Sequence, residues 1–237
     1  MAVQFLFYFF ESYIIPVFVH PENLECYPIK HSRLFCTRWN GLDKTGGIID
    51  ALDSAEYTGS LIILLNEGIG FIRRNMKTRW KKTDDSRIEM PDYCERSVFE
   101  SLVNALIHRD YLILGSEVHI DIYDDRLTIT SPGGMVDGSR IQDRNLYSVS
   151  STRRNPILAD VFGILGYMER QGSGFRKIRE TYHAAYHYRD GLEPEFYSDK
   201  NSFQVTLFNL NYGIEDSDDI SFVEHEQDTS RKNRTPL

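Results

Sequence analysis

The clearest pattern along the chain is a helical one that separates apolar from polar positions between residues 93 and 109. A helix advances about 100° per residue, so side chains three and four apart lie on one face. One face is apolar and carries Phe99, Leu102, Val103 and Leu106. The opposite face carries a polar row of Ser97, Glu100, Ser101, Asn104 and His108. Packing needs the apolar face but does not need the polar row, so the row predicts a functional site.

Alternating apolar and polar residues predict the strands. The segment 33–39 reads as a strand, and Val118, Ile120 and Ile122 alternate with polar residues before a turn at Asp124–Asp125. The returning strand gives a first antiparallel hairpin. A second hairpin is predicted from 195–198 and 203–207, around a turn at 199–201.

Helical spacing predicts three further helices. They cover residues 57–75, a segment that begins at Pro156 and ends near 163–166, and a segment from 175 to about 187. The order of helix, hairpin, loop, two helices and hairpin predicts an α/β fold, a two-layer sandwich with a mixed, largely antiparallel sheet.

Shifts in composition predict the organisation of the chain. Residues 1–53 form a small partial α/β piece, residues 54–86 form a helix with a charged linker, and residues 87–211 form the main domain. Residues 212–237 form an acidic tail that is expected to be disordered.

Charge and cysteine content narrow the class of protein. The formal net charge of -8 argues against a broad basic surface for duplex DNA, although seven acidic residues lie between Glu215 and Asp228 alone. The three cysteines have no spacing typical of a zinc site and read as reduced thiols. No run of about 18 apolar residues occurs, so we expect a cytoplasmic protein without a membrane span.

Glycines near predicted helix starts complete a candidate anion site. Gly172, Ser173 and Gly174 precede a helix, whose first backbone N–H groups can bind phosphate. Gly133 and Gly134 follow a strand and allow a second close backbone approach.

The polar row supplies the remaining chemistry. The amide oxygen of Asn104 is a suitable Mg²⁺ ligand together with substrate phosphates. Glu100, one turn away, is placed to accept a proton from an attacking water. Each residue also has a simpler explanation: Asn104 as a tether to a loop, Glu100 as a solvated residue and His108 as a structural contact. Only the combination favours a site, in which His108 contacts the nucleotide.

Several segments of the chain resemble a known family. Glu100-x-x-x-Asn104-Ala105 resembles the N box of the GHKL (Bergerat-fold) ATPases. Four segments more closely resemble the domain labelled "ATP-dependent DNA helicase RecG-related, C-terminal": Asn104–Tyr111, Asp124–Gly134, Arg154-Asn155-Pro156 and Gly172–Gly174. Residues 21–75 resemble the end of a Schlafen/AlbA-type DNA-binding domain that precedes it in transcriptional regulators.

The resemblance implies roles for individual residues. Asn104 would be the magnesium ligand, Glu100 the water-activating carboxylate, and Gly172 and Gly174 the glycines that close on the phosphates of ATP. No Walker-type phosphate loop occurs, so translocation on DNA is not supported. The chain departs from the superfamily at Ser131-Pro132-Gly133-Gly134, where an adenine-binding aspartate would be expected. A base edge buried without its polar partner costs a few kcal/mol.

Two further hypotheses stand beside a Mg²⁺–ATP binding module or slow ATPase. One is a non-catalytic regulatory domain of the same fold that forms a homodimer. The other is DNA binding through the basic segment 73–82, which also contains Trp80. A solvated linker explains that segment as well, and we favour the linker.

Overall fold

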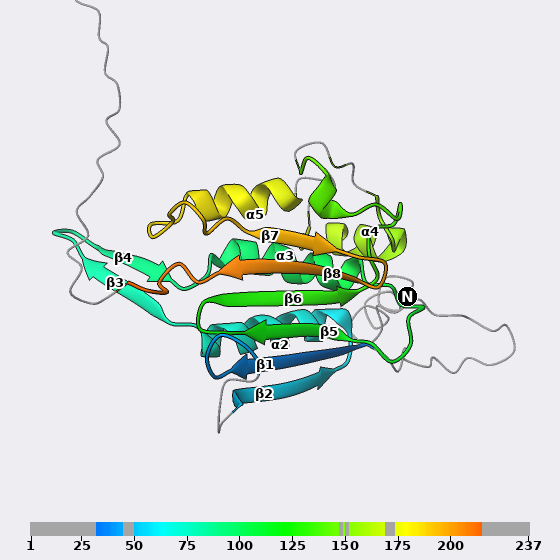
Figure 1. Cartoon of the computed structure of the whole chain (residues 1–237), viewed down its shortest axis with the longest axis horizontal. Coiled ribbons are helices and arrows are strands. Elements are labelled where there is room, and N and C mark those ends of the chain that lie inside the picture. Colours follow the sequence, from blue (N-terminus) through cyan, green and yellow to red (C-terminus); the bar gives the residue numbers. More distant parts are fainter. Residues whose placement is uncertain (1–31, 45–49, 147–148, 150–151, 169–173, 215–237) are drawn as a thin grey trace, which may run out of the picture.

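The computed structural model describes residues 32–44, 50–146, 149, 152–168 and 174–214. Six strands form one mixed sheet in the order β2-β1-β5-β6-β8-β7 (Figure 1). Their bounds are β1 Arg33–Trp39, β2 Ala51–Thr58, β5 Val118–Ile122, β6 Arg126–Pro132, β7 Glu195–Ser198 and β8 Ser202–Phe208. The pair β1–β5 is parallel and the other four pairs are antiparallel.

Helices cover one face of this sheet. Helix α2 (Leu61–Asn75) packs on β1, β2 and β5, and α3 (Glu95–Ile107) packs on β6 and β8. Helix α5 (Gly174–His183) lies against α3, and α4 (Pro156–Ile164) lies at one end of the molecule together with the short η1 (Ile141–Asp143) (Figure 1). The α/β sandwich predicted from the sequence is confirmed.

The core follows from the alternation along the strands. Leu34, Ile120 and Ile129 point to the helices and are at most 1% exposed. Gly68 of α2 marks the tightest crossing, because a Cβ there would lie 2.7 Å from the Leu102 side chain and 2.8 Å from that of Leu34. A larger residue at this position would push α2 away from both α3 and the sheet.

Most local predictions are confirmed. Both hairpins, the strand at 33–39 and the helix that begins at Pro156 are present. The helix predicted from residue 57 begins at Leu61, because β2 continues to Thr58 and Ser60 caps α2. The polar-row helix spans Glu95–Ile107, within the predicted range.

Strands lie at the two boundaries expected from the sequence, because residue 53 is within β2 and residue 86 directly precedes β4 (Arg87–Pro91). Strand β1 pairs in parallel with β5 of the predicted main domain. The segment expected to be a linker forms a hairpin of β3 (Thr78–Lys82) and β4, which extends away from the body (Figure 1). The turn between the two strands is closed by hydrogen bonds between Thr83 and Ser86, which involve both backbones and the Thr83 hydroxyl.

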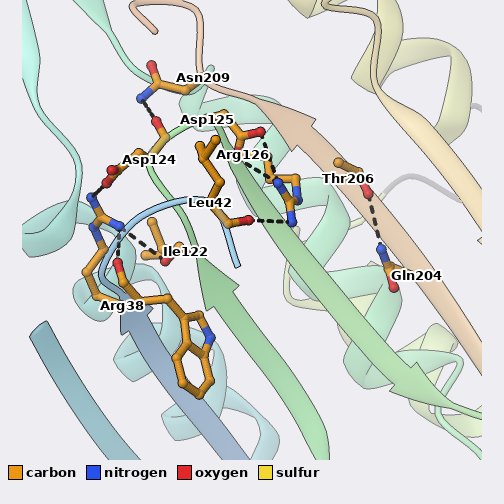
Figure 2. Close-up of polar contacts among 10 residues, drawn as sticks. Arg38, Leu42, Ile122, Asp124, Asp125, Arg126, Gln204, Thr206 and Asn209 are labelled. Carbon is orange, nitrogen blue, oxygen red and sulfur yellow. Dashed lines mark hydrogen bonds and ion pairs between the residues drawn. The ribbon is translucent and has the colours of Figure 1, made fainter. Parts of the chain in front are cut away.

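The β5–β6 turn ties the N-terminal strands to the C-terminal end of the sheet (Figure 2). Arg38 forms an ion pair with Asp124, whose carbonyl accepts a hydrogen bond of 2.9 Å from Asn209 Nδ2. Arg126 donates to Asp125 at 2.8 Å and to the Leu42 carbonyl at 2.9 Å. These contacts join β1 and the residues after it to the β5–β6 turn, and they join that turn to the residues after β8.

Among the described residues, the helices are too short or too polar to cross a membrane. The acidic tail lies outside the described residues from position 215 onward.

Candidate functional site

Helix α3 carries the polar row, and two of its serines fix the helix in place. Ser97 Oγ donates to the Ile178 carbonyl of α5 at 3.0 Å, and Ser101 Oγ donates to the Ser97 carbonyl at 2.7 Å. Both serines are fully buried. The serine part of the row therefore faces α5, and Ser97 joins the two helices directly.

Glu100 is a buried carboxylate with a partner. Its side chain is 6% exposed, and Oε1 lies 2.6 Å from Nη2 of Arg96, one turn earlier on α3. A carboxylate is rarely buried unless a cation or hydrogen-bond donors compensate its charge. Arg96 provides that compensation, and its own side chain is half exposed.

Asn104 faces the start of α5. A Cβ built on Gly174 would lie 3.0 Å from Nδ2 of Asn104, so a glycine at this position lets the α5 N-terminus approach the amide. Backbone N–H groups at a helix N-terminus favour anions. Gly172 and Ser173, predicted to belong to the same site, lie outside the described residues.

One pocket brings the described candidate residues together. Its wall consists of the polar face of α3, the end of β6, the loop after β6, part of β8 and the first turns of α5. The sequence-predicted residues that line it are Glu100, Asn104, His108, Gly133, Gly134 and Gly174.

Among the charged side chains of the pocket wall, cations outnumber acids. Arg144, Arg153, Arg154 and Lys177 line it, against the two acids Glu100 and Asp137. Arg153 pairs with Asp160 at 3.0 Å, and Arg154 pairs with Asp110 at 2.9 Å. Paired arginines keep further donors for an anionic ligand, because each guanidinium carries five N–H groups.

His108 is held neutral in this setting. Burial, followed by the charges of Arg154 and Arg153, lowers the pKa of His108 from 6.5 to about 4. Near pH 7 the imidazole therefore presents one N–H donor and one acceptor to the pocket.

The two glycines after β6 have a packing role. Gly133 has a φ of +94°, and a Cβ there would lie 2.6 Å from Cβ of Asp110. Its N–H donates to the Asn201 carbonyl at 2.7 Å, so this amide is used within the fold. At Gly134 a Cβ would lie 1.8 Å from the Asp199 carbonyl oxygen, which leaves room for glycine alone.

Sequence reasoning gave no role to Arg154 and Asn155, which join the pocket walls. Arg154 Nη1 binds Asp110 and Nη2 donates to the Gly134 carbonyl at 2.6 Å. Asn155 Nδ2 donates to the carbonyls of Ile107 and Arg109 at 2.7 and 2.8 Å, and so satisfies the C-terminal end of α3. The sequence signal for these two residues was the segment Arg154-Asn155-Pro156.

Ser131 is the first residue of the segment 131–134, where the resemblance led us to expect an aspartate. Its hydroxyl is buried and donates to the Ala105 carbonyl of α3 at 2.7 Å. The side chain therefore joins β6 to α3 at the pocket wall.

Comparison with known proteins finds a similar family for part of the chain. Residues 115–207 match the family model "Putative ATP-dependent DNA helicase recG C-terminal", a range that begins after Glu100, Asn104 and His108. No curated protein matches the chain.

A similar solved structure is that of the DIP2311 protein from Corynebacterium diphtheriae, with 19% sequence identity and a TM-score of 0.64. The similarity covers 78% of this chain but only 36% of that protein, so it bears on the fold alone. The family match supports a RecG C-terminal-like, ATPase-related domain for residues 115–207.

Proposed function

We propose that the pocket between α3 and α5 binds a Mg²⁺–nucleotide, with ATP as the expected ligand. The observation that carries this proposal is the position of Glu100 and Asn104, one turn apart, in a pocket that also contains the α5 N-terminus and four cationic side chains. The family match to an ATPase-related domain supports the same class of ligand.

The chemistry of the donor set fits a magnesium nucleotide. The Asn104 amide oxygen is a hard oxygen ligand of the kind Mg²⁺ accepts alongside phosphate oxygens and waters. When bound, Mg²⁺ would neutralise developing charge on the phosphates. The guanidinium groups of Arg153 and Arg154 would share that task, and the α5 N-terminus would donate N–H groups to phosphate oxygens.

Glu100 is the candidate general base. Its ion pair with Arg96 leaves the second carboxylate oxygen available to accept a proton from a water that attacks the terminal phosphate. The products would be the nucleoside diphosphate and inorganic phosphate, with the proton on Glu100 before its release to solvent.

Ligand binding to the native state alone raises the melting temperature, which gives a direct test. We expect millimolar MgATP to raise the Tm of the full chain by several degrees, and Asn104→Ala to remove that shift. Asn66→Ala is the matched control, because Asn66 is an exposed helical asparagine on α2 that does not line the pocket. A shift that persists in Asn104→Ala, or none in the wild type, would contradict the proposal.

Turnover separates the ATPase from a non-catalytic regulatory domain, the second hypothesis. We expect Glu100→Gln to retain the Tm shift with MgATP but to lose phosphate release at least about 100-fold, because the amide cannot accept the proton. Binding without phosphate release in the wild type would favour the regulatory domain, in which the nucleotide acts as a signal.

DNA binding by residues 73–82 has less support. Two cations of this segment already have acidic partners, because Arg73 pairs with Glu95 at 3.2 Å and Arg74 pairs with Asp53 at 2.8 Å. The Schlafen-type segment, a role in transcription and a homodimer remain predictions.

A further inference from the structure

The pocket has an apolar part in addition to its cationic wall. Its apolar lining includes Ile129, Met135, Val149, Met168, Phe175 and Phe203. A polyphosphate is anionic and hydrated, so contact with an apolar surface does not stabilise it. The apolar part therefore identifies where the base of a nucleotide would lie.

Two aromatic rings in this part are held in fixed positions. Phe175 of α5 stacks on Phe203 of β8, with ring centroids 5.9 Å apart and an angle of 23° between the rings. Phe175 and Phe196 pack in a T-shaped arrangement, with ring centroids 4.8 Å apart and an angle of 71° between the rings. Rings packed in this way provide a preformed apolar wall, and the faces of aromatic rings attract any nucleobase because every base has a π-face.

Two methionine side chains also belong to the apolar lining of the pocket. Met135 lies on the loop after β6 and Met168 follows α4, and both line the pocket. Thioether side chains are flexible and polarisable, and they are common on surfaces that accept ligands of different shape. Such a wall adapts to a purine or to a smaller pyrimidine.

Three polar side chains of the pocket lining are engaged within the protein. Ser131 Oγ donates to the Ala105 carbonyl, and Glu100 is paired with Arg96. Asp137 accepts from Ser139 and pairs with Arg144. Among the described lining residues, Asn104 and His108 carry further donor and acceptor groups on the α3 side of the pocket, which the proposed function assigns to Mg²⁺ and the phosphates.

We infer that this apolar part holds the base by stacking and dispersion, so that the pocket accepts purine and pyrimidine nucleoside triphosphates alike. The inference rests on the proposed function and names its ligand class more broadly than ATP. A site that reads a base through hydrogen bonds rejects the wrong one by about 10⁴-fold or more. Contact by stacking alone discriminates far less, because it depends on ring area.

The test compares Mg²⁺ complexes of ATP, GTP, CTP and UTP by isothermal titration calorimetry with the full chain. Dissociation constants within about tenfold of one another support the inference. A preference for ATP above about 100-fold overturns the inference while the proposed function stands. Absence of binding by all four overturns the proposed function and the inference with it.

Substitution of the aromatic wall gives the second measurement. Phe203→Leu is expected to weaken all four nucleotides by a similar factor, about tenfold. The control is Phe208→Leu on the same strand, a residue that does not line the pocket and should leave the four constants unchanged. If Phe203→Leu fails to fold, Met135→Ala on the loop serves instead, with the same equal weakening expected. A variant that weakens one base selectively, or none, overturns the inference.

Discussion

Two side chains of the pocket have different charged surroundings. Glu100 is buried beside Arg96, and His108 is buried beside Arg153 and Arg154. Glu100 has a cationic partner, whereas burial, followed by the charges of Arg154 and Arg153, lowers the pKa of His108 to about 4. One stretch of α3 thus presents an acceptor carboxylate and a neutral imidazole to the same ligand space.

The depressed pKa of His108 predicts a contribution to the pH dependence of stability. The unfolded chain binds a proton at this residue below pH 6.5, whereas the native state does so only below about pH 4. The native state is therefore penalised as the pH falls between these values, and the free energy of unfolding rises with pH in that window. We expect His108→Gln to reduce the slope of the free energy of unfolding against pH in this window, because the variant lacks the imidazole that titrates there.

Urea unfolding at pH values from 4 to 7 measures that difference between wild type and variant. Arg154→Gln provides an independent check, because removal of the neighbouring positive charge should raise the pKa of His108, as followed by the imidazole proton resonances. Equal slopes in wild type and His108→Gln would show that the imidazole titrates alike in both states.

At the scale of elements, α3 is held from three sides. Ser97 joins it to α5, Ser131 joins its Ala105 carbonyl to β6, and Asn155 joins its last turn to the start of α4. The last carbonyls of a helix have no partner within the helix, so an external donor is needed where they are buried. The position of the polar row depends on these three contacts.

Asn155 offers a test of this arrangement. Asn155→Ala leaves the carbonyls of Ile107 and Arg109 without their donor, and we expect it to lower the free energy of unfolding by about 1–3 kcal/mol. It should also weaken nucleotide binding, because His108 lies between these two carbonyls. Chemical denaturation followed by circular dichroism measures the loss, with Asn66→Ala on α2 as the control. A loss no greater than that of the control would show that Asn155 does not fix α3.

The elements that could be predicted are those with local signals. Alternation at 118–122 and a turn at Asp124–Asp125 specify a hairpin without reference to distant residues, and helical spacing places Glu100 and Asn104 on one face. The same spacing could have identified Arg96, which lies one turn before Glu100. The cationic side chains Arg144 and Arg153 could not be placed, because loops bring them to the pocket through tertiary packing.

The elements that were missed lack such signals. The strands of the parallel pair β1–β5 lie far apart in the sequence and are not joined by a short turn. No local sequence pattern therefore predicts that they pair. The β3–β4 hairpin pairs charged and polar residues, such as Lys82 with Arg87, and so it reads as a linker. Trp80, 60% exposed, was the one strand-forming aromatic in that segment.

At the scale of the whole molecule, one core extends from the first strand to the last. Around Gly68 the side chains of Leu34, Leu102 and Ile120 meet, which brings together β1, α2, α3 and β5. Ion pairs between Arg38 and Asp124 and between Arg73 and Glu95 join the same halves at the surface. The part of the chain that sequence composition set apart thus supplies two strands and a helix to the sheet and core behind the pocket.

This continuity predicts the behaviour of fragments. A fragment of residues 87–211, the main domain expected from the sequence, would lack β1, β2 and α2 and would expose Leu102 and Ile120 to water. It would also leave β5 as an unpaired edge, which favours aggregation. We expect this fragment to show no cooperative thermal transition, whereas a fragment of residues 32–214 melts cooperatively and keeps the Tm shift with MgATP. Circular dichroism melts and the dispersion of amide proton resonances report both properties. Cooperative melting of 87–211 would show that the pocket-bearing part folds alone and that the N-terminal strands are an addition to it, because a complete core must then form without Leu34 and α2.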